Sequence, residues 1–181
     1  VGVVDKKNLL HKNKIKVNDI VLAIPSSGLH SNGFSLIRSI LKKRKNTYLS
    51  PLIKKELIKP TKIYVDEINK INSKKLINGC ANITGGGLLN NVIRVIPENF
   101  CLNINLSKIK IKSIFKWVKK NNIKDSEMLK TFNCGVGFCL IANKKNIKRI
   151  EKIFSKKYRP YPIGFVTKEK TRIKTFGKLK W

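Results

Sequence analysis

The residues with the clearest potential for chemistry form one stretch, Pro25-Ser26-Ser27-Gly28-Leu29-His30-Ser31-Asn32-Gly33. Its serines and Asn32 offer side-chain hydrogen-bond donors, and His30 can titrate near neutral pH. Its two glycines let the backbone turn tightly or approach a ligand closely. These groups together have the chemistry of an anion pocket, most simply for a phosphate. The alternative is a structural turn in which Ser31 or Asn32 caps a helix.

The elements on either side of this stretch indicate how it is positioned. Residues 19–24 are a short apolar run with β-branched members, which predicts a buried strand. Phe34, Ile37 and Leu41 follow at helical spacing. A strand-to-helix junction directs backbone N–H groups and the positive end of a helix dipole at one spot. The local pattern therefore suits an anion site and a simple structural turn equally well.

A second stretch, Asn82-Ile83-Thr84-Gly85-Gly86-Gly87, repeats this arrangement. Residues 77–83 predict a strand, and apolar residues at positions 89, 92, 93 and 96 mark one face of a helix. Glycine costs about 0.5–1 kcal/mol relative to alanine in regular structure. Three successive glycines therefore indicate a place where the backbone closely approaches a ligand or another part of the chain.

The rest of the chain alternates between strand and helix patterns. We expect strands at residues 99–106, 138–142, 161–166 and 171–176, and helices at 66–75, 111–118, 125–131 and 147–154. The last two strands suggest a hairpin around residues 168–170. The order predicts an α/β (α+β) fold, a layered sandwich with a mixed sheet flanked by helices, in one domain over residues 1–181.

The net charge of +30 raises the question of nucleic-acid binding. Only six of the 40 basic residues are arginine, the side chain preferred for forked base and phosphate contacts, and the lysines are spread along the chain. Lysine, asparagine and isoleucine all have A/T-rich codons. Genome base bias is thus the preferred cause, and we expect no specific nucleic-acid partner.

The four cysteines lie in apolar contexts without a CxxC pair, which is typical of buried thiols in a reducing compartment. No metal-ligand constellation is visible. There is no apolar run of membrane-spanning length and no secretory signal. The chain is therefore expected in the cytoplasm, away from membranes. Because it begins with Val1, we interpret it as a piece of a longer protein.

Taken together, several blocks resemble the phosphoribosylformylglycinamidine cyclo-ligase (AIR synthetase) family. They come in that family's order: residues 19–38, residues 60–65, residues 83–88 with Asn91, Arg94, Val95 and Pro97, the pair Glu127-Met128, and residues 131–137. The resemblance spans nearly the whole chain but only the family's C-terminal domain. It implies that the N-terminal ATP-binding half is absent from residues 1–181.

This resemblance implies ATP-dependent cyclisation of formylglycinamidine ribonucleotide to aminoimidazole ribonucleotide in de novo purine biosynthesis. It further implies that the N-terminal half of the same enzyme binds most of the ATP and Mg²⁺, and that the full enzyme is a homodimer. The chain alone is then expected to be inactive. Catalysis of this kind depends mainly on positioning and charge stabilisation.

Carried over residue by residue, the resemblance implies a catalytic role for His30, in proton transfer or charge stabilisation. It implies substrate or phosphate binding by Ser27, Gly28, Ser31, Asn32, Thr84, Gly85, Gly86, Gly87 and Asn133. For Asn133 a backbone-capping role is the alternative. The chain departs from the family pattern at Asn82, where a histidine is usual, and at Phe138, where methionine is frequent. Asparagine donates hydrogen bonds but does not shuttle protons.

Two other functions are alternatives to this one. One is another ATP-using enzyme of the same superfamily, of the selenophosphate synthetase, thiamine-phosphate kinase or formylglycinamidine synthetase type. The blocks at residues 30–32 and 132–135 argue against it. The other is a basic nucleic-acid-binding module, which would have to bind at physiological salt.

Overall fold

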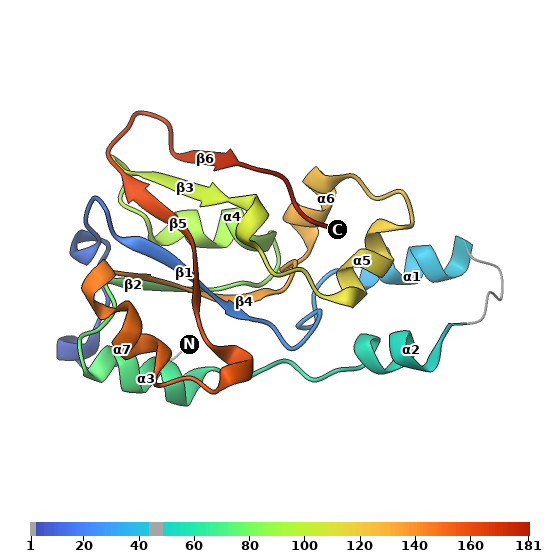
Figure 1. Ribbon diagram of the computed structural model, residues 1–181, viewed down its shortest axis with the longest axis horizontal. Coiled ribbons are helices and arrows are strands. Elements are labelled where there is room, and N and C mark those ends of the chain that lie inside the picture. Colours follow the sequence, from blue (N-terminus) through green and yellow to red (C-terminus); the bar gives the residue numbers. More distant parts are fainter. Residues whose placement is uncertain (1–2, 44–48) are drawn as a thin grey trace.

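The computed structural model describes residues 3–43 and 49–181, which form a sheet between two layers of helices (Figure 1). The strands are β1 (Ile20–Pro25), β2 (Gly79–Asn82), β3 (Cys101–Asn105), β4 (Val136–Ala142), β5 (Tyr161–Thr167) and β6 (Ile173–Phe176). The helices are α1 (Phe34–Lys43), α2 (Pro51–Leu57), α3 (Val65–Ser73), α4 (Gly87–Val92), α5 (Ser113–Lys119), α6 (Asp125–Thr131) and α7 (Ile147–Glu151). The predicted fold class is confirmed.

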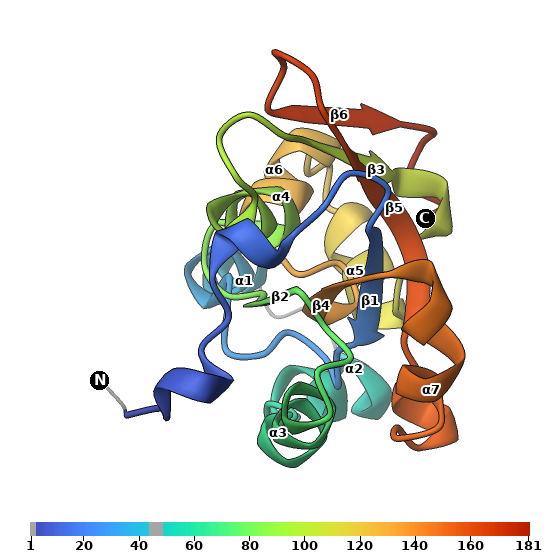
Figure 2. The ribbon, with the colours of Figure 1, turned by 90° about the vertical axis from the view of Figure 1, so that its left-hand side faces the viewer.

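Helices cover both faces of the sheet, so the molecule has two apolar cores. Val21 and Ala23 of β1 belong to the core that includes α1, α4, α5 and α6. Leu22 and Ile24 point the other way, toward α3 and α7 (Figure 2). Because both faces are buried, β1 is a continuous apolar run instead of an alternating one.

The strand order is β2-β4-β1-β5-β3-β6 in the described chain. β4 runs antiparallel to both β1 and β2, with Pro25 opposite Val136 and Asn82 opposite Phe138. The last residues of β1 and β2 therefore lie beside the first residues of β4. This register brings the two glycine-containing loops and the segment before β4 to one end of the sheet.

The predicted hairpin between the last two strands is wrong. β6 pairs with β3, in parallel, and β5 pairs with β1 and β3. Since both edges of β5 are occupied, the free edge of β3 is the place where the final strand can add to the sheet.

Candidate functional site

The side chain of Asn133 holds the loop of residues 26–33 in place through hydrogen bonds. Its fully buried side chain donates to the carbonyl oxygens of Gly28 (2.9 Å) and Leu29 (3.3 Å) and accepts from the N–H of Gly135 (2.8 Å). All these partners are backbone groups. The geometry thus matches the backbone-capping alternative for Asn133, and a direct substrate contact stays a prediction.

The segment before α3 holds the same loop from the side. The Ser27 hydroxyl donates to the carbonyl of Pro60 over 2.7 Å, and the Tyr64 hydroxyl donates to the carbonyl of Pro25 over 2.8 Å. Tyr64 is buried, and nothing in the loop's own sequence indicated this contact. The loop is therefore supported by two distant parts of the sequence: Pro60 is more than 30 positions away, and Asn133 is more than 100 positions away.

His30 acts inside this loop as a hydrogen-bond acceptor. Its Nε2 lies 2.9 Å from the backbone N of Ser27, and since that N–H can only donate, Nε2 carries no proton. Burial, and then the positive charge of Lys112, lower the pKa of His30 to about 4. At neutral pH the imidazole is therefore uncharged, with its proton on Nδ1.

The loop backbone is strained at residues 30 and 31. His30 and Ser31 both adopt left-handed conformations, with φ of 54° and 59°, which side chains other than glycine rarely adopt. Gly33 follows with φ of 76°, and a Cβ there would lie 2.2 Å from the Phe132 ring. Strain of this kind gathers at binding and catalytic sites.

A single side chain, Asn91 of α4, organises the second glycine loop. Its amide nitrogen donates to the carbonyls of Thr84 (3.3 Å), Gly85 (3.2 Å) and Gly87 (2.7 Å). Its amide oxygen accepts from the Thr84 hydroxyl (3.3 Å). The sequence pattern did not indicate this role, because Asn91 lies off the apolar face predicted from residues 89, 92, 93 and 96, whereas in the structure it is buried together with Leu88 and Val92.

The glycines of this loop serve different purposes. A Cβ on Gly87, whose φ is 70°, would lie 1.8 Å from the carbonyl oxygen of Leu129 in α6, so this glycine allows two helices to pack closely. Around Gly85 the nearest atom is the amide oxygen of Asn32, 4.0 Å from such a Cβ. The two glycine loops thus face each other across Gly85 and Asn32.

The structure brings all the predicted site residues to this end of the sheet. Those that reach solvent at least in part are Ser31, Asn32, Thr84, Gly85 and Gly86. Those that are buried are Ser27, Gly28, His30, Gly87 and Asn133. The first group can meet a ligand directly. The second shapes the backbone beneath it, although His30 uses only Nε2 within the loop and keeps its Nδ1–H for a ligand at the site.

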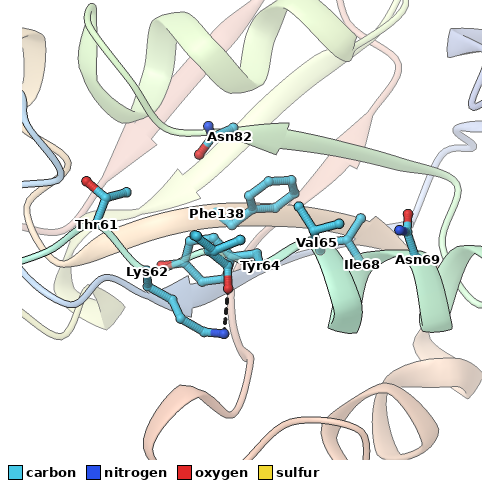
Figure 3. Close-up of a pocket in the computed structure, with 9 residues that line it drawn as sticks. Thr61, Lys62, Tyr64, Val65, Ile68, Asn69, Asn82 and Phe138 are labelled. Atoms are coloured by element: carbon cyan, nitrogen blue, oxygen red, sulfur yellow. Dashed lines mark hydrogen bonds between the residues drawn. The ribbon is translucent and has the colours of Figure 1, made fainter. Parts of the chain in front are cut away.

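A pocket of about 360 Å³ adjoins these loops (Figure 3). Its lining is mainly apolar with a few amides and hydroxyls: Thr61, Lys62, Ile63, Tyr64, Val65, Ile68, Asn69, Asn82 and Phe138. The rings of Tyr64 and Phe138 pack with centroids 5.4 Å apart. Thr61 connects the pocket to the first loop through its hydroxyl, 3.4 Å from that of Ser31.

Within residues 3–43 and 49–181, no group of three histidine, cysteine or acidic side chains is arranged to hold a metal ion. Every helix in those ranges is too short or too polar to span a bilayer. The four cysteines are free thiols, three of them buried.

Comparison with known families identifies the fold and its motifs. Residues 16–175 match the family described as AIR synthase related protein, C-terminal domain. The chain belongs to this family. The phosphoribosylformylglycinamidine cyclo-ligase of Thermodesulfovibrio yellowstonii is 38% identical over 177 residues, which cover 93% of this chain and 52% of that protein. The chain thus spans about half the length of this relative.

Solved structures share the AIR synthase fold at lower identity. Thermotoga maritima PurL, solved with FGAR, matches with a TM-score of 0.61 and 12% identity, over 96% of this chain and 28% of its own. AaThiL, the Aquifex aeolicus thiamine monophosphate kinase, solved with AMPPCP and TMP, matches with a TM-score of 0.58 and 16% identity, over 93% and 51%. These likenesses establish the fold alone.

Proposed function

We propose that this chain is the substrate-binding, C-terminal half of a phosphoribosylformylglycinamidine cyclo-ligase. The full enzyme would use ATP to close formylglycinamidine ribonucleotide into aminoimidazole ribonucleotide, as a cytoplasmic homodimer in purine biosynthesis. The observation that carries the proposal is the 38% identity to a cyclo-ligase over nearly the whole chain. The convergence of the matching blocks at one end of the sheet supports it.

The anionic part of the substrate would lie between the two glycine loops. Ser31 and Asn32 present exposed or half-exposed donors there, and the hydroxyl of Thr84, which donates to Asn91, would accept from the ligand. Gly85 leaves room for a ligand at the backbone. The left-handed backbone at residues 30–31 supports this placement, because such strain gathers at binding sites. A phosphate on the substrate is the simplest such group.

In the proposed reaction the formyl-amide oxygen attacks the terminal phosphoryl group of ATP, and ADP leaves. An internal nitrogen then attacks the activated carbon, and phosphate departs with the transferred oxygen. Neutral His30 would contribute as a donor through Nδ1–H, stabilising negative charge, because its lowered pKa leaves no second proton to give at neutral pH.

Mg²⁺ prefers several oxygen ligands such as carboxylates, and the described residues contain no such cluster of acidic side chains. We therefore assign Mg²⁺, and most of the contacts to ATP, to the N-terminal half of the enzyme. On this assignment the chain by itself binds substrate but does not turn it over.

A complementation assay tests the proposal. The chain is mixed with the N-terminal half from the same source, ATP, Mg²⁺ and formylglycinamidine ribonucleotide, and the aminoimidazole product is followed. We expect product from the mixture, none from either half, and loss of product with Ser27→Ala. Turnover of thiamine phosphate, or of selenide with ATP, by the same mixture would overturn the proposal.

Binding to the chain alone gives an independent test. Inorganic phosphate, titrated into ¹⁵N-labelled protein, is expected to shift the amide signals of residues 27–33 and 84–87 selectively. Uniform small shifts across lysine-rich surfaces would instead indicate only the nonspecific attraction of a strongly basic protein.

A further inference from the structure

Two exposed aliphatic side chains stand at the rim of the pocket in Figure 3. Ile63 is 73% exposed and Val65 is 57% exposed, and they continue an apolar lining formed by Ile68 and Phe138. Single exposed aliphatic residues are ordinary on protein surfaces. Two that extend an apolar pocket form a patch of the kind that partners cover.

Two carboxamide side chains on the same rim are also available to a partner. Asn69 and Asn82 line the pocket, and neither side chain forms a hydrogen bond within the described ranges. Each carboxamide has donors and an acceptor, which match the backbone of another polypeptide. The rim therefore combines apolar area with polar groups able to fix an orientation, as protein interfaces do.

The start of the described chain lies beside this rim. Residues 3–8 run along α3, where the Asn72 amide donates to the carbonyl of Asn8 over 2.7 Å. Val3 and Val4 line a second hollow together with Asn69, which also lines the pocket of Figure 3. Val3 and Val4 therefore lie close to the exposed rim.

We propose that the rim formed by Ile63, Val65, Asn69 and Asn82 is the docking surface for the N-terminal half of the enzyme, an inference that rests on the proposed function. The matched relative is about twice as long as the matched region, so it has enough polypeptide for a second domain. The family's name places this domain at the C-terminus, so that second domain precedes it.

Docking here would also complete the site. Thr61 lines the pocket and approaches Ser31, while Asn82 stands two residues before Thr84. A domain seated on the rim would therefore border both glycine loops and exclude water from them. This position explains in physical terms why neither half would be active without the other.

Calorimetric titration of the chain with the N-terminal half, without substrate, tests the surface. The double variant Ile63→Ser, Val65→Ser is expected to weaken binding at least about tenfold, since two exposed aliphatic groups lose a partner. Phe176→Ser is the matched control: it removes a 45% exposed apolar side chain from β6, at the opposite edge of the sheet from β2. Its affinity is expected to equal that of the wild type.

Equal affinity of the double variant and the wild type, or no binding of the wild-type halves, would overturn the docking surface. So would a dimer of the chain alone that the double variant dissolves, because the rim would then join two copies. Circular dichroism melts confirm that the variants are folded. Failure of the proposed function looks different: the halves bind through the rim, yet formylglycinamidine ribonucleotide is not cyclised.

Discussion

Asn82 of β2 and Phe138 of β4 are direct cross-strand partners, and both line the pocket beside the glycine loops. These are two positions at which the family resemblance leads us to expect other residues, histidine and methionine. Cross-strand neighbours share one environment, so a change in one alters the packing of the other. The departures thus form one coupled change in the lining of the pocket.

The first prediction concerns the missing imidazole. Asn82→His places a group that can transfer protons at the mouth of the pocket, and general acid–base catalysis contributes roughly 100-fold or more where it operates. We expect the complementation assay to show a cyclisation rate at least about tenfold higher. Because Asn82 is exposed, the stability should change by no more than about 0.5 kcal/mol.

Asn90→His is the control, since it adds the same side chain at an exposed position of α4, outside the pocket and the docking surface. It should leave the rate unchanged. An equal increase in both variants would show that the effect is a general one of added imidazole, and an unchanged rate in Asn82→His would remove position 82 from the chemistry.

The second prediction is a pH dependence of stability that arises from His30. Its pKa is about 4 when folded and near 6.5 when exposed in the unfolded chain, so the unfolded state binds the proton first as the pH falls. The neutral imidazole therefore stabilises the fold fully above about pH 6.5. This contribution is lost progressively between pH 6.5 and 4.

Urea unfolding across that range measures the effect. His30→Gln should be less stable than the wild type at pH 7 and should show a flatter profile between pH 6.5 and 4. His11→Gln is the control because His11 is exposed, and its profile should follow that of the wild type. Parallel profiles for His30→Gln and the wild type would contradict the buried, neutral histidine.

How far the sequence predicted the molecule depended on the range of the interactions involved. The run at residues 19–24 carries a continuous apolar pattern, and the helix at 125–131 begins with an acidic first turn; both elements form where expected. The pairing of β6 with β3 was missed, because the choice of partner depends on which sheet edge is free.

The same limit applies to the site. The sequence indicated both glycine loops, and the structure brings them together. It did not indicate that Tyr64 and Asn91 hold them, since those contacts depend on where buried polar groups meet in space. It also assigned the glycines of 85–87 one purpose, whereas Gly87 serves the packing of α6.

The third prediction tests Asn91 as the residue that positions the second loop. Asn91→Ala removes every side-chain bond to the carbonyls of residues 84, 85 and 87, and should cost about 2 kcal/mol of unfolding free energy. The phosphate-induced amide shifts of residues 84–87 should vanish, while those of residues 27–33 persist.

Asn90→Ala is the neighbouring control, because Asn90 is exposed. It should keep both sets of shifts and the wild-type stability. If Asn91→Ala lost stability but kept the shifts at residues 84–87, Asn91 would support the fold without shaping the binding loop.

The fourth prediction separates the glycines of the second loop. Gly87→Ala would force a Cβ against the Leu129 carbonyl at a left-handed φ, so α4 and α6 would have to move apart. We expect a loss of at least about 3 kcal/mol in urea unfolding. Gly85→Ala has open space around it, and should be neutral or slightly stabilising because alanine lowers the entropy of the unfolded chain. If Gly85→Ala kept its stability but lost the phosphate-induced amide shifts, the open space at this glycine would serve the ligand. Equal losses of stability in Gly85→Ala and Gly87→Ala would contradict the close approach of α4 and α6.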